Sequence, residues 1–445
     1  MPVKALVNFF RVPPPAPLIA DEATHDRVYR RWSQLAFASV TVGYGFYYTT
    51  RLSLSVTKKP LLDSGLVDTT QLGSIGFAML LAYAVGKAVN GFLGDRVHLS
   101  RFFIAGLILS ALTNLCFGLS SSFSWFVVLW SINGWFQSLG ATTSGVSLTS
   151  WFPSGKLGTR YSLWSISHNL GEGLTFVVTA AMVSGLGWRW GFIGPALACI
   201  AVALVLLRTL PDRPPSLGLR PPQKEVLPPE ALPSVSAVQW EAARNPLVWM
   251  IGLASACMYV ARYALSNWGV LYLQVEHKYS LMEASSAISM IPIVGALGTL
   301  SSGPISDYIF RARRGPSSLF FGGLLVLAMC LLLLVRAPSP LLVRASLGVA
   351  GFAIGGQLLF LGGLSAAELC SRRAAGAALG IVGGVSYLGA AVQDYVSGWL
   401  LQAGGAVGEP LGFGRVKTFW IGAAVVSVLL TMPLVVRGTK HPDHR

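Results

Sequence analysis

Charged residues are scarce in this sequence of 445 residues, since Asp, Glu, Lys and Arg together make up only 11% of it. Soluble domains carry about 25% charged residues. Hydrophobic residues account for 53% of the chain, and the mean hydropathy is +0.60. The shortage of charge therefore excludes a soluble enzyme of this size and indicates a protein that crosses a membrane several times.

Catalytic and nucleotide-binding motifs are also missing. The five cysteines stand singly, and none forms a Cys-x-x-Cys pair. Such cysteines are more often small buried hydrophobic residues than metal ligands or disulfide partners. The chain has no Gly-x-x-x-x-Gly-Lys-Ser/Thr loop, no His-Glu-x-x-His pair and no nucleophile elbow. These absences argue against ATP-driven pumping and hydrolysis, so we expect no enzyme activity, metal or other cofactor.

The formal net charge of +15 is typical of some nucleic-acid-binding proteins. Here, however, the basic residues lie in short loops between apolar runs and concentrate on alternate loops. By the positive-inside rule, this pattern places both termini in the cytoplasm. Membrane topology therefore explains the positive charge, and no nucleic-acid partner is expected. Lys58 and Lys59 fall near the opposite side in this scheme. Prolines between residues 13 and 17 interrupt the first apolar segment, so no cleaved signal peptide is expected.

Apolar runs long enough to cross the roughly 30 Å of hydrocarbon number about twelve between Ser33 and Val436. Because a backbone in lipid must satisfy its own hydrogen bonds, these runs predict an all-α membrane protein. A segment rich in proline and charge divides them, and we expect a short helix in it near residues 236–243. The expected units are a cytoplasmic N-terminal segment, a six-helix bundle, a cytoplasmic linker, a second six-helix bundle and a cytoplasmic tail, at residues 1–32, 33–210, 211–245, 246–437 and 438–445.

One short pattern occurs twice, as Tyr48-Thr49-Thr50-Arg51 and as Tyr259-Val260-Ala261-Arg262. An acidic loop motif follows each copy at a similar distance and is a candidate for conformational gating. Its residues are Gly91, Asp95 and Arg96 in the first half and Asp307 in the second. The sequence therefore predicts two related halves, each with an arginine inside an apolar helix.

An arginine in such a position is costly and usually marks a substrate or ion pathway. Because Arg51 and Arg262 occupy equivalent places in the repeat, we expect them to face each other across a central cavity. A guanidinium presents a planar fork that matches two phosphate oxygens and stays charged at physiological pH. The two arginines are thus candidates for an anion clamp. The alternative is that each pairs with a buried carboxylate, and the candidate acids are Glu172 and Asp394.

Other polar residues lie in the same apolar runs. Lys87 brings the buried cations to three against two acids, an excess of one positive charge that suits a dianion such as a phosphate monoester. His168 can donate to a phosphate oxygen and titrate near neutral pH, although a packing role is the alternative. Tyr44, Tyr48 and Tyr259 lie on the arginine faces of their helices, where their hydroxyls can complete the phosphate shell.

The duplicated six-helix pattern, the long linker and the motif from Gly91 to Arg96 resemble the major facilitator superfamily, in which two six-helix bundles rock around a central site. The segments that carry a narrower resemblance are residues 43–51, 83–87, 133–137, 168–171 and 259–268. They resemble the organophosphate:phosphate antiporter family. Residues 16–19, 212–219 and 374–380 carry a closer resemblance, to the branch of hexose-phosphate transporters and the glucose 6-phosphate receptor. The resemblance implies a monomer in the lipid bilayer of a bacterial inner membrane that exchanges a sugar phosphate for inorganic phosphate. The residues it implies for the substrate site are Arg51, Arg262, Lys87, His168, Tyr44, Tyr48 and Tyr259. Asn169 and Asn267, in the same segments, are further candidates for this site.

The sequence departs from the family pattern at three positions. Asn267 replaces a usual aspartate, Pro292 stands where an acidic residue is common, and Glu172 replaces a glycine. Three functions stay open: an antiporter, a receptor that signals to a membrane histidine kinase, and a proton-coupled facilitator for drugs or sugars. The arginine pair argues against the last of these.

Overall fold

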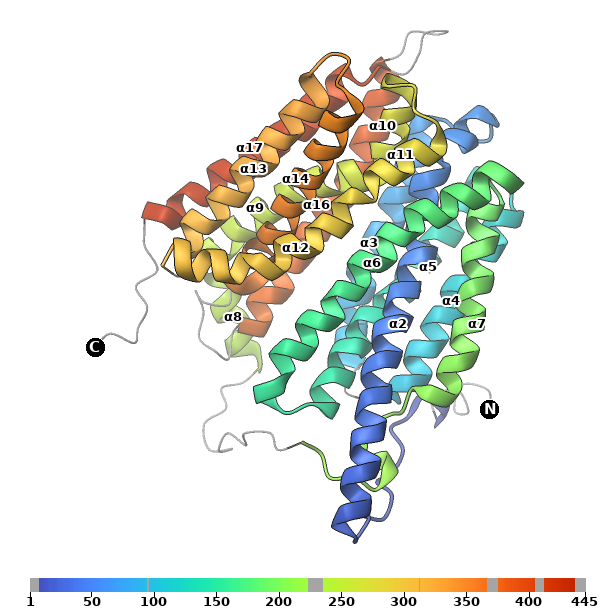
Figure 1. Ribbon diagram of the computed structural model, residues 1–445, viewed down its shortest axis with the longest axis vertical. Coiled ribbons are helices and arrows are strands. Elements are labelled where there is room, and N and C mark those ends of the chain that lie inside the picture. Colours follow the sequence, from blue (N-terminus) through green and yellow to red (C-terminus); the bar gives the residue numbers. More distant parts are fainter. Residues whose placement is uncertain are drawn as a thin grey trace.

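The computed structural model describes residues 8–93, 96–222, 235–311, 313–365, 375–404 and 412–436. Within these ranges the regular structure is helical, and the extended pairing is limited to one isolated bridge between Arg11 and Val97. Figure 1 shows the helices as two side-by-side groups that correspond to the two halves of the sequence. The prediction of an all-α membrane protein is confirmed.

The first half contains six long helices. In chain order they are α2 (Glu22–Asp63), α3 (Thr69–Leu93), α4 (Leu99–Leu119), α5 (Phe123–Trp151), α6 (Ser154–Leu186) and α7 (Trp190–Thr209). A short helical turn, η2 (Pro214–Leu217), follows, and α8 (Val235–Arg244) precedes the second half. The short linker helix expected near residues 236–243 is thus present.

The second half also forms six membrane-length segments, but three of them contain a π-helical turn. The uninterrupted ones are α13 (Arg314–Leu334), α16 (Ala375–Gly404) and α17 (Gly414–Val436). The interrupted ones are α9 (Pro246–Tyr263) with η4 (Ala264–Trp268) and α10 (Gly269–Glu276), α11 (Leu281–Ile288) with α12 (Met290–Pro304) and η5 (Ile305–Ile309), and α14 (Pro340–Leu359) with η6 (Phe360–Leu364). The turn η4 comes directly after Arg262, and such turns are frequent at functional sites.

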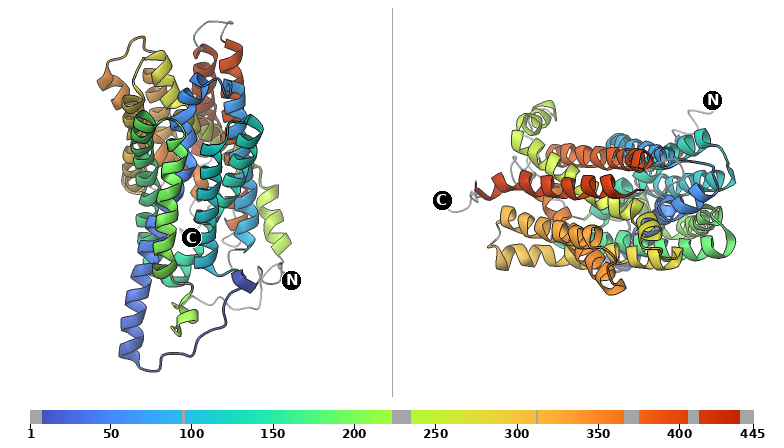
Figure 2. Two further views of the ribbon diagram at one scale, coloured as in Figure 1. Left: turned by 90° about the vertical axis from the view of Figure 1, so that its right-hand side faces the viewer. Right: turned by 90° about the horizontal axis from the view of Figure 1, so that it is seen from above.

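Among the described residues, nine helices are long and apolar enough to cross a membrane. The other long helices are α2, α5 and α16, which contain buried polar side chains such as Arg51, Gln137 and Asp394. They pack among the nine in the same two groups, as the end-on view in Figure 2 shows. The chain is therefore a multi-pass membrane protein, and its described ranges contain twelve membrane-length helical segments in two bundles.

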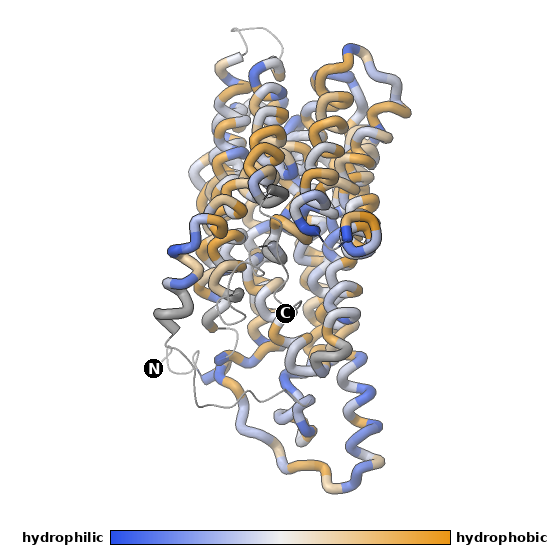
Figure 3. The backbone as a smooth tube through the Cα atoms, turned by 90° about the vertical axis from the view of Figure 1, so that its left-hand side faces the viewer, coloured by the Kyte–Doolittle hydropathy of each residue, from blue (hydrophilic) through white to orange (hydrophobic). Residues whose placement is uncertain are grey.

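The first helix is longer than the sequence predicts, because it begins at Glu22 rather than near Ser33. Asp21 caps it by accepting a hydrogen bond from the Thr24 amide at 2.9 Å, and Glu22 adds a favourable charge in the first turn. Figure 3 shows this hydrophilic end of α2 projecting beyond the bundle. The hydropathy pattern that predicts membrane helices misses this end of α2, because the end is stabilised by a helix cap and a favourable charge rather than by apolar residues.

The two bundles are joined where α3 packs against α16. A Cβ on Gly398 would lie 2.2 Å from the Thr69 carbonyl oxygen, so the two backbones approach as closely as glycine allows. The Thr69 hydroxyl also donates to Gln402 at 2.8 Å. At the other end of α16, none of the described residues lies within 4 Å of a Cβ built on Gly380 or Gly384. The bundles thus touch at the Thr69 end and separate toward the end that carries the linker.

Candidate functional site

Arg51 lies in the second half of α2 and is only 6% exposed. It donates a hydrogen bond to the Tyr263 hydroxyl of the other bundle at 2.9 Å. Its guanidinium carbon lies 4.3 Å from the Tyr83 ring centroid and 5.5 Å from that of Tyr48. Among the described residues no carboxylate forms an ion pair with it. Aromatic faces stabilise the guanidinium without neutralising its charge.

Arg262 lies in the last turn of α9, in the second bundle. Its guanidinium carbon is 5.7 Å from the Tyr259 ring centroid and 5.5 Å from that of Tyr263. One guanidinium nitrogen lies 3.8 Å from a carboxylate oxygen of Glu172, which also accepts a hydrogen bond from Ser266 at 3.1 Å. The alternative that each arginine pairs with a buried carboxylate therefore holds for Arg262 but, among the described residues, not for Arg51. Tyr263 contacts both guanidiniums.

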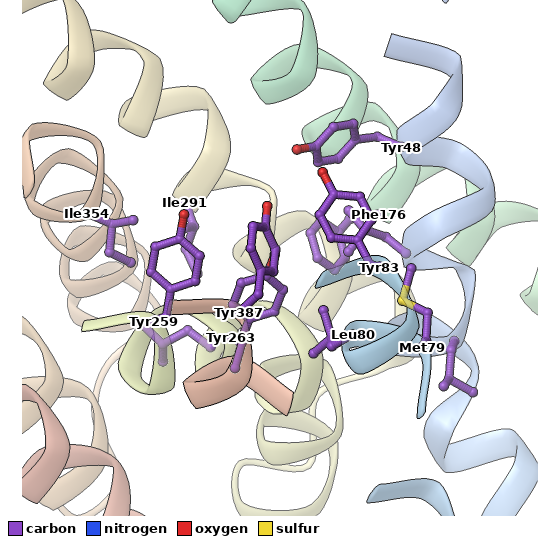
Figure 4. Packing of buried hydrophobic residues seen from close by; sticks show 14 of the residues in the cluster. Tyr48, Met79, Leu80, Tyr83, Phe176, Tyr259, Tyr263, Ile291, Ile354 and Tyr387 are labelled. Carbon is purple, nitrogen blue, oxygen red and sulfur yellow. The ribbon is translucent and has the colours of Figure 1, made fainter. Parts of the chain in front are cut away.

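Five tyrosines surround the two arginines. Figure 4 shows Tyr48 and Tyr83 of the first bundle facing Tyr259, Tyr263 and Tyr387 of the second. The Tyr387 ring lies 4.8 Å from the Tyr83 ring and 5.4 Å from the Tyr259 ring, so it bridges the bundles. Tyrosine hydroxyls both donate and accept hydrogen bonds, which suits a phosphate and a sugar equally. Tyr83 and Tyr387 were not among the residues expected at the site.

The other expected residues differ in how close they lie to this cluster. The Lys87 ammonium is 5.3 Å from the Tyr387 ring centroid, and its side chain is exposed. The His168 ring lies 5.6 Å from the Tyr48 ring, while Tyr44 stacks on Trp164 at 4.8 Å. Lys87, His168 and Tyr44 thus border the tyrosines.

Asn169 lies apart from the arginines. Its side-chain amide donates to the Ser165 carbonyl of its own helix at 3.4 Å, and its oxygen is 4.0 Å from a Cβ built on Gly295 of α12. Pro292 and Ile293 of α12 contact the same helix near Gly173. Asn169 therefore lies at the packing surface between α6 and α12 rather than against a guanidinium.

A buried network of amides and hydroxyls fixes the turn of α2 that carries Arg51. The side-chain amides of Asn114 and Asn133 each donate to the Thr50 carbonyl at 3.0 Å. The Gln137 amide donates to the Tyr47 carbonyl at 3.0 Å and to the Ser110 hydroxyl at 2.8 Å. Helices α4 and α5 therefore hold the backbone of α2 that carries Arg51, on the side away from the tyrosines and Arg262.

We expect Gln137→Leu to destabilise the protein by about 1–3 kcal/mol, because the buried Tyr47 carbonyl and Ser110 hydroxyl lose the hydrogen bonds that the Gln137 amide donates. The side chain is 2% exposed, so water cannot replace it. A lower melting temperature of the purified protein is the expected result. Thr149→Val is the matched control, since the Thr149 hydroxyl bonds only within its own exposed turn. An unchanged melting temperature for Gln137→Leu contradicts the prediction.

Asp394 does not contact the arginine cluster. One of its carboxylate oxygens accepts a hydrogen bond from the Trp268 indole at 2.7 Å and lies 3.8 Å from the Lys58 ammonium. The other accepts from Asn267 at 2.7 Å. Lys58 and Asp394 are each 1% exposed, so the pair is buried and joins α2 to α16. A small cavity of about 20 Å³ separates this group from Arg51.

Lys58 changes the charge balance expected from the sequence. Of the cations in these helices, Arg51 and Lys58 are buried, Arg262 is half-buried and Lys87 is exposed. Against the acids Glu172 and Asp394, the excess is two positive charges rather than one. The loop placement of Lys58 is wrong, because α2 continues to Asp63 through Pro60. Since Asp394 neutralises Lys58 and Glu172 neutralises Arg262, the excess lies on Arg51 and Lys87.

The candidate gating motif lies at the linker end. Gly91 and Arg96 are exposed, and a Cβ on Gly91 would meet no described residue within 4 Å. Asp95 falls outside the described residues. Asp307 lies in η5 and pairs with Arg314 at 3.1 Å, on the same side of the second bundle.

Comparison with solved structures places the fold. A nucleoside transporter, NupG, superposes with a TM-score of 0.71 over 90% of this chain and 99% of that one, at 16% identity. A bacterial homologue of the human lysosomal transporter Spinster gives a TM-score of 0.69 over 91% and 95% of the two chains, also at 16% identity. At this identity the similarity concerns the fold alone.

Sequence comparison places the family. The major facilitator superfamily model matches residues 35–393. The chain is 33% identical over 439 residues to the membrane sensor protein UhpC of Salmonella typhimurium, covering 97% of this chain and 98% of that protein. It is 32% identical to a probable hexose phosphate transport protein of Chlamydia pneumoniae, with 96% of each chain covered, and 29% identical to a glycerol-3-phosphate transporter of Bacillus subtilis, with 89% and 92% covered. The chain belongs to the major facilitator superfamily and, within it, to the organophosphate:phosphate antiporter family.

Proposed function

We propose that this protein exchanges hexose 6-phosphate for inorganic phosphate across a bacterial inner membrane by alternating access. The observation that carries the proposal is the position of Arg51 and Arg262, one from each bundle, on the same group of tyrosines. The names of relatives at 32% and 33% identity support a hexose phosphate as the organic substrate. The proposal includes a monomer with no cofactor.

The phosphoryl group binds between the two arginines in this mechanism. Arg51 has no carboxylate partner among the described residues, so it supplies the unneutralised charge for one phosphate oxygen. Arg262 turns from Glu172 toward a second oxygen, and Lys87 and His168 add donors at the edge. The sugar hydroxyls then form hydrogen bonds with the tyrosine hydroxyls around the two arginines.

Obligate exchange follows from the charge on the two bundles. When the site is empty, two guanidiniums on opposite bundles repel each other as the bundles close over the cavity. A bound dianion neutralises them and draws the bundles together, so loaded protein changes conformation and empty protein does not. The bundles separate at the linker end, and we propose that this end and both termini face the cytoplasm.

The direct test is an exchange assay with purified protein. Proteoliposomes loaded with inorganic phosphate are expected to take up labelled glucose 6-phosphate, whereas vesicles without internal phosphate are not. Uptake that needs no internal phosphate but follows a pH gradient overturns the exchange mechanism. A panel of other phosphate esters as competitors then identifies the preferred organic substrate.

A receptor that signals to a membrane histidine kinase is the second candidate, because one relative at 33% identity is named a membrane sensor protein. The same arginine site serves both functions. Pull-down of a histidine kinase, together with glucose 6-phosphate binding but no exchange by the purified protein, identifies the receptor. Exchange by the protein alone identifies the carrier.

Glu172→Gln is expected to strengthen phosphate binding. The substitution keeps the shape of the side chain and its hydrogen bond with Ser266, but it removes the negative charge that lies 3.8 Å from Arg262. The KM for external phosphate should fall about tenfold, equivalent to about 1.4 kcal/mol, and turnover should slow because release becomes harder. Glu283→Gln, at an exposed helix cap, is the matched control. An unchanged or higher KM for Glu172→Gln contradicts this role.

A further inference from the structure

Outside the central site, an apolar groove of about 480 Å³ runs between α2, α6 and α7. Its walls are almost entirely hydrocarbon. Val42, Leu170 and Leu174 at its edge are 52%, 51% and 62% exposed. Figure 1 shows these three helices side by side on one face of the first bundle. In a membrane-spanning bundle, this face is in contact with lipid.

A second hollow of about 410 Å³ lies nearer the linker end of α2 and α6. It contains Arg30 and Arg160, which approach from the two helices. Arg160 is one helical turn before Leu163, which lines the apolar groove, so the two hollows follow each other along α6. One hollow is basic and the other is apolar.

The two arginines are available for an external anion. The Arg160 guanidinium carbon lies 4.9 Å from the Phe37 ring centroid and 5.0 Å from that of Phe152, which fixes its position without neutralising it. No carboxylate among the described residues forms an ion pair with Arg30 or Arg160. Tyr29 also lines this hollow, and tyrosine is enriched at lipid headgroup level.

We propose that the two hollows together bind one anionic phospholipid. Its phosphate lies between Arg30 and Arg160, and one acyl chain follows the groove between α2, α6 and α7. Basic pockets at helix ends select anionic headgroups, whereas the ammonium of a zwitterionic lipid offsets its own phosphate. The site is separate from the central cavity, so it does not depend on which solute the protein transports.

Native mass spectrometry of the full-length protein in detergent tests the proposal, with dioleoyl phosphatidylglycerol and dioleoyl phosphatidylcholine as probes. Phosphatidylglycerol should be retained in preference. The R30Q/R160Q double variant should bind it about thirtyfold more weakly, at about 1 kcal/mol per basic side chain near the surface. R208Q is the matched control, because Arg208 is an exposed arginine in the last turn of α7 and lines neither hollow. The R160Q single variant, with about a fivefold loss expected, provides the measurement if the double variant does not fold.

Four results overturn the proposal. Equal retention of phosphatidylglycerol and phosphatidylcholine shows that the protein does not select an anionic headgroup. An equally large loss of phosphatidylglycerol binding in R208Q shows that any surface arginine attracts the lipid. Short-chain dihexanoyl phosphatidylglycerol that competes as well as the dioleoyl lipid shows that the groove holds no acyl chain. Inorganic phosphate that displaces the lipid at millimolar concentration points to a free-phosphate site instead and also contradicts the assignment.

Discussion

Replacing Arg51 by lysine is expected to lower phosphate exchange about a hundredfold. An ammonium keeps the charge but loses the planar fork that meets two phosphate oxygens, and each hydrogen bond to a charged group is worth about 1.5–3 kcal/mol. The lysine is also too short to keep both the bond to Tyr263 and the position over the Tyr83 ring. The loss should lie mainly in kcat/KM for both phosphate and glucose 6-phosphate.

The matched control for this variant is Arg189→Lys. Arg189 also lies over an aromatic ring, that of Trp188 at 4.5 Å, and also donates to a hydroxyl, that of Ser121 at 2.8 Å, but it is outside the cluster. Its exchange rate should match that of the unmodified protein. Undiminished exchange by Arg51→Lys, with normal expression, would falsify the clamp. Loss of exchange with intact glucose 6-phosphate binding assigns Arg51 to the conformational change instead.

The helical architecture follows from the sequence, because lipid requires an internally bonded backbone and the apolar runs have membrane length. The limits of α2 do not follow from hydropathy. Asp21 and Glu22 start the helix through capping and charge, and Pro60 fails to end it. At both ends, the residues that determine where the helix begins and ends are not the apolar residues that determine where the membrane span begins and ends.

The residues around each arginine are harder to predict. The repeat places Arg51 and Arg262 in equivalent helices, but it assigns the same surroundings to both. In the structure Glu172 pairs with one arginine only, because it reaches Arg262 from α6 across the boundary between the bundles. Tyr387 comes from a distant helix, and nothing in its local sequence marks it for the site.

Lys58 could have been found from spacing alone. It follows Arg51 by two helical turns, so both side chains lie on the same face of α2. The adjacent Lys59 and Pro60 favoured a loop interpretation instead. Its partner was beyond sequence reasoning, since the π-helical turn after Arg262 brings Asn267 and Trp268 to Asp394. The polar residue that replaces the usual aspartate therefore serves the bundle contact rather than the arginine.

The Lys58–Asp394 pair closes the end of the protein where the bundles touch, so the two charges must separate when that end opens. Asp394→Asn should destabilise the protein by about 3–5 kcal/mol, because it leaves Lys58 charged and buried without a counter-ion. Lys58→Met removes the other partner, and Asp394 then keeps its bonds from Asn267 and Trp268, so the loss should be smaller. Thermal unfolding of the purified variants measures both effects.

The double variant Lys58→Met/Asp394→Asn separates stability from gating. It carries no charge at either of the two positions, so it should recover most of the stability that Asp394→Asn loses, and the non-additive difference is the coupling energy of the pair. It should also open more readily, because the attraction between α2 and α16 is gone. Ser55→Cys reports this opening, since Ser55 is buried beside Lys58 in the small cavity. Faster labelling of that cysteine by a membrane-impermeant thiol reagent in the double variant, at unchanged melting temperature, identifies the pair as a latch. Equal labelling in both backgrounds shows that the pair serves packing alone, and that the glycine contact between α3 and α16 holds this end closed without it.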